Sequence, residues 1–218
     1  TRDMFLRDGK ADPELSQTGA LASGVPGSLA VYDAALRKAG KLTLREHLLN
    51  AAKIAEAGFV VTPRYSRVLQ HVAADLLKFE SSRTNFLKDG KPYPAGDILK
   101  QPDLAKTYRA MATNGIGWFY GGPFAQATEQ WMKQNGGITT AEDYKNYRME
   151  NREPIFTSYR GNKIVSFPPP SSGGVHVAEI LNILDQFDLK KLGSNSPEMI
   201  HLVAEAMKLA FADRAYWL

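Results

Sequence analysis

The stretch FPPPSSGGV at residues 167–175 decides how the second half of this sequence folds. Just before it, apolar and polar residues alternate in 155–159 and again in 163–167, and a turn sequence at 160–162 separates the two runs. This pattern predicts a β-hairpin. The three prolines end its second strand, because proline has no N–H to donate to a strand partner. Ser171-Ser172-Gly173-Gly174 then leads into a predicted helix whose apolar residues recur every three or four positions.

Helical patterns dominate the residues before this hairpin. A helix is predicted over 25–39, with Gly40 placed to end it in a left-handed conformation. Thr43 and Glu46 have the spacing of a capping box and start a second helix. A third helix opens at Thr62-Pro63. We expect the second and third helices to form a helical hairpin.

The remaining signals complete the predicted fold class. They are a hairpin or turn within 88–103, helices over 104–111 and 123–134, a short helix capped by Thr139 or Thr140, and a last helix capped at Ser196-Pro197. The chain is therefore expected to be α+β, predominantly helical, with a β-hairpin near 155–167. A lone hairpin is marginally stable in water, so these strands should belong to a larger sheet. We expect a helical portion over 22–150, followed by the hairpin and two helices over 154–218.

Composition excludes several classes of function. The 218 residues are 44% apolar, enough for a real core, and the net charge of +4 is spread along the chain without a basic stripe typical of nucleic-acid binders. No apolar run is long enough to span a membrane. The absence of cysteine removes disulfides, thiolate metal sites and cysteine catalysis from consideration. No nucleic-acid partner and no membrane segment are expected in this chain.

Histidines give no support to a metal or cofactor site. His47, His71, His176 and His201 are scattered, without an HExxH pair or a carboxylate at metal spacing. No Walker loop, dinucleotide fingerprint or G-x-S-x-G elbow occurs. The histidines are interpreted as surface or packing residues, and no metal and no cofactor are predicted.

Two short segments have both a chemical and a structural interpretation. Ser171, Ser172, Gly173 and Gly174 precede a helix, and free amides at a helix N-terminus can hold an anion. The structural interpretation, which we favour, is that a serine caps the helix and the glycines let backbones approach closely. The pair Thr139-Thr140 resembles a threonine nucleophile, but the acidic residues that follow it indicate helix capping.

These segments, taken in order, resemble a known family. The stretch at 167–175, followed by ILNIL at 180–184, is similar to the PPPSSGG…LNIL signature of γ-glutamyltranspeptidases. Further elements of that family appear in the same order: SGVPG at 23–27, GFVV at 58–61, GWFYGG at 117–122, GGIT at 136–139, YRG at 159–161 and EAMKLAFADR at 205–214. The resemblance covers nearly the whole chain.

The resemblance implies an N-terminal nucleophile hydrolase with an αββα sandwich. Such an enzyme is made as one precursor, cuts itself, and uses the threonine exposed on its small subunit to take a γ-glutamyl group from glutathione. Water or an amino-acid or peptide acceptor then resolves the acyl-threonine. The family's nucleophile motif, Thr-Thr followed by His-Tyr-Ser, is expected downstream of Leu218, and its carboxylate-binding arginine before Thr1. No residue of the chain is assigned a catalytic role.

The expected partners are therefore the small subunit of the same precursor, γ-glutamyl substrates and their acceptors. The family is exported, which implies a periplasmic or secreted location, with any signal peptide outside the 218 residues. Two alternatives remain open. One is a related self-processing acylase, and the other is a stand-alone helical interaction domain.

Overall fold

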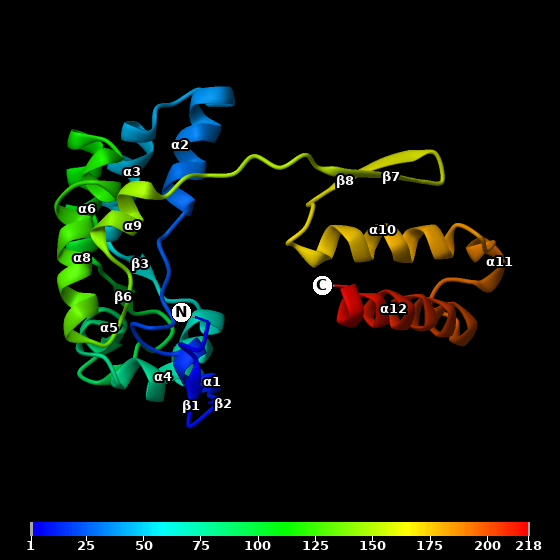
Figure 1. The fold of residues 1–218 in the computed structure, drawn as a ribbon, viewed down its shortest axis with the longest axis horizontal. Helices are drawn as coiled ribbons and strands as arrows, with labels where there is room; N and C mark the ends of the chain where they lie inside the picture. Colours follow the sequence, from blue (N-terminus) through cyan, green and yellow to red (C-terminus); the bar gives the residue numbers. More distant parts are fainter. Residues whose placement is uncertain (1, 218) are drawn as a thin grey trace. The chain divides into compact units, whose positions relative to one another are not determined.

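The computed structural model describes residues 2–217, which form two compact units that meet in sequence at Met149 and Glu150 (Figure 1). The helices of the first unit are α1 (Pro13–Gln17), α2 (Ser28–Ala39), α3 (Leu44–Ala57), α4 (Pro63–Leu77), α5 (Glu80–Phe86), α6 (Pro102–Asn114), α7 (Gly117–Tyr120), α8 (Pro123–Gln134) and α9 (Ala141–Asn146). Its strands are β1 (Leu6–Arg7), β2 (Lys10–Ala11), β3 (Phe59–Val60), β4 (Leu87–Lys88), β5 (Lys91–Pro92) and β6 (Ile98–Leu99). The second unit contains β7 (Ile155–Tyr159), β8 (Asn162–Ser166), α10 (Ser172–Leu184), α11 (Leu189–Leu192) and α12 (Pro197–Trp217).

Side-chain caps fix where several helices begin. The Thr43 hydroxyl accepts the Glu46 N–H at 3.2 Å, and the Glu46 carboxylate accepts the Thr43 N–H at 2.8 Å. The predicted capping box at α3 is therefore confirmed. The Thr43 N–H first, and then the Thr43 hydroxyl, which also donates to this carboxylate at 2.7 Å, hold the pKa of Glu46 below its ordinary value. Thr62 caps α4 in the predicted way, by accepting the Tyr65 N–H.

The prediction that Gly40 ends α2 in a left-handed conformation is wrong. Its φ is −75° and its ψ is 147°, an extended conformation. A Cβ added at this position would lie 2.6 Å from the carbonyl oxygen of Leu36, so glycine is needed here for close approach to the preceding turn. Gly58, which ends α3, does have a positive φ of 86°.

The predicted helical hairpin of α3 and α4 is also wrong, because α3 packs against α6. Ala52 and Ala55 on α3 face Ala105 on α6, and these small buried side chains let the two helices approach closely. Between α3 and α4 the chain is extended and forms β3, which pairs antiparallel with β6. This pairing leads the chain away from a tight helix–helix turn.

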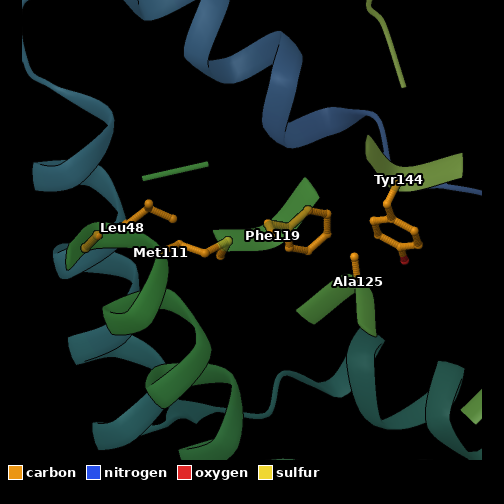
Figure 2. Close-up of a cluster of buried hydrophobic side chains, with 6 residues drawn as sticks. Leu48, Met111, Phe119, Ala125 and Tyr144 are labelled. Carbon is orange, nitrogen blue, oxygen red and sulfur yellow. The ribbon is translucent and has the colours of Figure 1, made fainter. Parts of the chain in front are cut away.

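An aromatic cluster forms the main core of the first unit. Figure 2 shows Leu48 of α3, Met111 of α6, Phe119 of α7, Ala125 of α8 and Tyr144 of α9 around one centre. All five are at most 8% exposed. The ring of Phe119 also stacks on Phe124, with centroids 4.2 Å apart. Helices from distant parts of the sequence are joined by this cluster.

The second unit is built on the predicted hairpin. Strands β7 and β8 pair in antiparallel register from Ile155 opposite Ser166 to Tyr159 opposite Asn162. Arg160 and Gly161 have φ values of 49° and 80°, and two successive positive values are typical of a type I′ turn. The hairpin at 155–167 is thus confirmed.

One face of this hairpin packs on α10 and the other is open. Thr157 donates a hydrogen bond to the side-chain oxygen of Asn182 on α10 at 3.1 Å. On the opposite face, Phe156 is 57% exposed and Val165 is 56% exposed. Within residues 2–217 the hairpin has no third strand. The larger sheet expected from the sequence stays a prediction.

Helices α10 and α12 pack against each other in the second unit. Their contact includes Ala206 and Ala210 of α12, which are fully buried. The predicted cap of α12 is confirmed, because the Ser196 hydroxyl accepts the Met199 N–H at 3.0 Å. In the part of the chain that the structure describes, no helix has the length and apolar character needed to cross a membrane.

Candidate functional site

The residues 171–174, at the start of α10, are the candidate anion site predicted from the sequence, and the two serines among them have different surroundings. Ser171 is the N-cap residue of α10 but makes no side-chain capping bond, so the expected serine cap is absent at this residue. The Ser172 hydroxyl instead accepts a hydrogen bond at 3.2 Å from Nε of Arg214 on α12. Ser172 therefore links the start of α10 to α12.

The two glycines of this segment also differ. A Cβ added to Gly174 would lie 2.1 Å from the carbonyl oxygen of Phe167, a distance that no real side chain occupies. A Cβ added to Gly173 would meet no atom within 4 Å. Close backbone approach therefore requires glycine at 174, whereas position 173 has room for a side chain.

A nucleophile–base pair is not assembled at this segment. Nδ1 of the buried His176 bonds to the backbone carbonyl oxygen of Ser172, not to its hydroxyl. The imidazole also stacks on Phe211 of α12, with centroids 6.3 Å apart. A general base must reach the proton that it removes, so His176 is not placed to activate Ser172. The packing interpretation of this histidine matches its surroundings.

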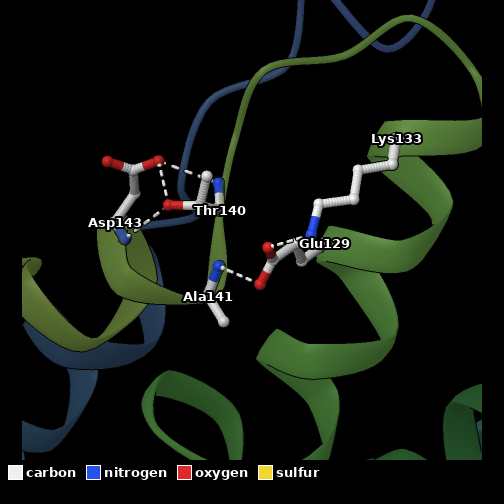
Figure 3. A network of polar contacts seen from close by, with 5 residues as sticks. All are labelled: Glu129, Lys133, Thr140, Ala141 and Asp143. Atoms are coloured by element: carbon white, nitrogen blue, oxygen red, sulfur yellow. Dashed lines mark hydrogen bonds and ion pairs between the residues drawn. The ribbon is translucent and has the colours of Figure 1, made fainter.

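Thr139 and Thr140 are engaged in structural hydrogen bonds. Figure 3 shows Thr140 in a second capping box, where its hydroxyl accepts the Asp143 N–H and the Asp143 carboxylate accepts the Thr140 N–H at 2.8 Å. The Thr140 N–H first, and then the Thr140 hydroxyl, which also donates to this carboxylate at 2.7 Å, hold the pKa of Asp143 below its ordinary value. The Thr139 hydroxyl donates to the carbonyl oxygen of Ser23 at 3.2 Å. Capping is thus the role that the contacts give to Thr140.

A neighbouring carboxylate completes the start of α9. Glu129 on α8 accepts the N–H of Ala141 at 3.1 Å and pairs with Lys133 at 2.5 Å (Figure 3). Lys133 first, and then the Ala141 N–H, keep the pKa of Glu129 below its ordinary value. The N–H groups of Thr140, Ala141 and Asp143 at this helix start are therefore each bonded to a carboxylate or hydroxyl of the protein.

The sequence interpretation missed a pair of carboxyl groups in the second unit. Glu179 of α10 and Asp213 of α12 line an open cavity of about 880 Å³, together with apolar residues of both helices and Ile155 of β7. Burial in this wall, followed by the nearby Asp213 charge, raises the pKa of Glu179, and His176 opposes the shift. The sequence contains a signal for the position of Glu179. This residue lies four positions from both Val175 and Ile183, so all three share the face of α10 that lines the cavity.

The other histidines do not converge. His47, His71 and His201 lie exposed on three different helices. Over residues 2–217, no three groups among histidine, aspartate and glutamate are arranged to hold a metal ion.

Comparison of the chain with known proteins shows which family it resembles. The γ-glutamyltranspeptidase family model matches residues 1–218. The glutathione hydrolase proenzyme of Escherichia coli K12 is 43% identical over 220 residues, which is all of this chain and 38% of that protein. The acylase ACY 1 proenzyme of Pseudomonas sp. strain V22 is 45% identical over 197 residues, 90% of this chain and 35% of that protein.

Solved structures agree with the sequence matches. The crystal structure of Helicobacter pylori γ-glutamyltranspeptidase superposes with a TM-score of 0.96 at 42% identity, covering 100% of this chain and 63% of that one. The 218 residues thus span less than two fifths of the curated relatives that they match. Because the family model matches residues 1–218 and the Escherichia coli relative is 43% identical over the whole chain, the chain belongs to the γ-glutamyltranspeptidase family.

Proposed function

We propose that the protein containing this chain transfers or hydrolyses the γ-glutamyl group of glutathione and related compounds. The observation that carries the proposal is the match of all 218 residues to the family model, together with 43% identity to a glutathione hydrolase proenzyme. A covalent acyl-threonine divides the difficult cleavage of an amide into two smaller barriers. In this proposal the threonine lies on the small subunit, and the present chain is part of the large subunit.

The role of the present chain is then to support the catalytic sandwich. The surroundings of Ser172 and Gly174 are consistent with a structural role, because Ser172 bonds to Arg214 and Gly174 packs on the Phe167 backbone. The exposed face of the hairpin at Phe156 and Val165 suits packing against the second sheet of the sandwich, to which the small subunit would contribute. A chain interface at this face would bury apolar side chains that are now in contact with water.

Release of a chromogenic amine from a γ-glutamyl anilide by the complete protein tests the activity. We expect turnover that is stimulated by an amino-acid or dipeptide acceptor, since a second nucleophile competes with water for the acyl-enzyme. A complete, processed protein that leaves the anilide intact would refute the proposal.

A related acylase is the second candidate, because the Pseudomonas acylase proenzyme is 45% identical to this chain. To separate the two activities, hydrolysis of a γ-glutamyl anilide is compared with hydrolysis of the amide-linked side chain of a β-lactam, at equal enzyme concentration. A higher kcat/KM for the β-lactam amide would favour the acylase. The whole-chain family match favours either enzyme over a stand-alone interaction domain.

Self-cleavage and export belong to the same proposal. The Escherichia coli relative is named a proenzyme, which supports synthesis as a precursor. We expect the complete protein to yield two chains without added protease, which an intact-mass measurement detects. We also expect the mature protein outside the cytoplasm, in the periplasm or secreted. Recovery of full-length, uncut protein in the cytosolic fraction would contradict both expectations.

A further inference from the structure

The dipeptide Asn-Gly occurs twice in the sequence, at Asn114-Gly115 and at Asn135-Gly136. In this arrangement the chain can attack its own side chain, because glycine has no Cβ to keep its backbone nitrogen away from the preceding asparagine. Both asparagines are exposed and lie at the C-terminal end of a helix, Asn114 at the end of α6 and Asn135 just beyond α8. The two sites can therefore be compared directly.

The two asparagine side chains are held in the same way. Nδ2 of Asn114 donates to the carbonyl oxygen of Ala110 at 2.9 Å, and Nδ2 of Asn135 donates to that of Trp131 at 2.8 Å. In each case the acceptor lies four residues earlier on the same helix. The side-chain contacts thus do not distinguish the two sites.

The backbone nitrogens that would attack these side chains differ. The Gly115 N–H donates to the carbonyl oxygen of Met111 at 2.8 Å. Within residues 2–217, no protein acceptor forms a hydrogen bond with the Gly136 N–H. A hydrogen bond made by the neutral N–H disfavours loss of its proton, so the Gly136 nitrogen ionises more readily than that of Gly115.

The chain that follows each asparagine differs as well. To bring the nitrogen to the side chain, the asparagine must rotate about its ψ bond, which moves the residues after it. At Asn135 this rotation breaks the bond from the Gly137 N–H to the Met132 carbonyl oxygen, and two consecutive glycines absorb the change. At Asn114 it would displace α7, whose Phe119 is 8% exposed in the aromatic core. Loss of core packing costs more than loss of one hydrogen bond at a helix end.

We propose that Asn135 is a deamidation site, which closes a succinimide ring with Gly136 and opens to aspartate or isoaspartate, whereas the fold protects Asn114. The Gly136 nitrogen gives its proton to hydroxide and bonds to Cγ of Asn135. The bond from Cγ to Nδ2 breaks, and the nitrogen takes a proton from water and leaves as ammonia. Water then adds to one of the two ring carbonyls and opens the ring.

The product changes the end of α8. A carboxylate replaces the amide at the C-terminal end of the helix, where the helix dipole disfavours negative charge. The reaction needs only water and hydroxide, so it is independent of the proposed γ-glutamyl chemistry.

Peptide mapping by mass spectrometry tests the proposal on the complete folded protein. The protein is incubated under mildly alkaline conditions, and samples are digested in acid, where the ring forms slowly. We expect Asn135 to be converted at least about five times as fast as Asn114, the factor that one hydrogen bond of ordinary strength confers. Isoaspartate should appear beside aspartate at position 135, because only opening of the ring produces it.

Two controls separate the effect of the fold from that of the sequence. In protein unfolded by urea, both asparagines precede glycine without a helix cap and should react at similar rates. Asn135→Gln should lose the modification at this position, because glutamine would have to close a larger ring, and should leave the rate at Asn114 unchanged. Three results would each overturn the proposal: conversion of Asn114 as fast as that of Asn135 in the folded protein, an Asn135 that reacts only in the unfolded protein, or aspartate without isoaspartate.

Discussion

The two units of this chain bury their apolar residues in different ways. In the first unit, Phe119 is 8% exposed and lies in a core formed by five helices. In the second, Phe156 and Phe167 are 57% and 74% exposed, although the hairpin and both long helices are well formed. Local signals such as turns and caps thus form the same elements in both units. A closed core requires partners on its apolar faces, and within residues 2–217 the hairpin face at Phe156 is left in contact with water.

The largest expected effect concerns catalysis, because we propose that the nucleophilic threonine lies on the small subunit and not in either unit of this chain. The 218-residue chain alone should not release amine from a γ-glutamyl anilide, while the processed complete protein should. Loss of the nucleophile from a covalent catalytic unit removes on the order of a million-fold in turnover. Activity of the purified chain near that of the complete protein would show that one of the two units holds an active site that its contacts do not reveal.

Replacing Phe119 or Phe156 with alanine measures how much each ring contributes to the free energy of unfolding. Phe119→Ala should lower the free energy of unfolding of the first unit by about 3–5 kcal/mol, because it leaves a cavity in a packed core. Phe156→Ala in the 218-residue chain should cost much less, since the ring is already in contact with water. In the complete protein, Phe156→Ala should become costly if a second sheet packs on this face. If Phe156→Ala has an equally small effect on the unfolding free energy of both proteins, the ring is not buried in the complete protein, and the contrast with Phe119 does not reflect a missing partner.

The glycines at the start of α10 allow a matched pair of variants. Gly174→Ala should destabilise the second unit by about 1–3 kcal/mol, because its Cβ would overlap the Phe167 backbone and force a shift. Gly173→Ala should be neutral or stabilising by up to about 1 kcal/mol, as alanine has the better helix propensity. Soluble yield and thermal unfolding check both variants. Loss of yield in Gly173→Ala would point to a role for that position beyond helix packing.

Local structure was predictable from the sequence wherever one segment contains its own signal. The capping boxes at Thr43 and Thr140, the turn at Arg160-Gly161 and the cap at Ser196 each depend on residues a few positions apart. Each of these hydrogen bonds or turns forms within one segment. Propensity and spacing therefore suffice to predict them.

Errors arose where distant segments decide the outcome. Which helix packs on α3 depends on the side chain that the other helix presents to Ala52 and Ala55. Ala105 of α6 packs against them, but the spacing of residues along α3 does not reveal this. Gly40 was assigned a positive φ because glycine often ends a helix that way, yet contact with Leu36 is what requires it. In the candidate site, the Ser172–Arg214 bond joins residues 42 positions apart. Its existence follows from helix packing and not from the PPPSSGG motif.

A smaller effect is expected in the first unit from Thr140, the N-cap residue of α9. Thr140→Ala removes the hydroxyl that accepts the Asp143 N–H and should cost about 1 kcal/mol. Thr140→Ser keeps the hydroxyl and should restore most of that loss. Thermal unfolding of the three proteins checks the series. No difference between alanine and serine would mean that Glu129, through the Ala141 N–H, is sufficient to start the helix.

The smallest expected effect is a pH dependence confined to the second unit. Burial, and then the charge of Asp213, raise the pKa of Glu179 above its ordinary value. A raised pKa in the folded state means that folding favours the protonated carboxyl. This contribution is present below the unfolded pKa of about 4.3 and is lost as the pH rises through the higher folded value. Glu179→Gln cannot ionise, so the variant should not lose this contribution as the pH rises. After correction for intrinsic exchange, hydrogen exchange in α10 should therefore depend less on pH in Glu179→Gln than in the wild type. Glu205→Gln is the control, because Lys208 lowers the pKa of Glu205 and gives the opposite slope. Parallel pH profiles for the wild type and Glu179→Gln would show that the cavity wall does not favour the protonated form of Glu179.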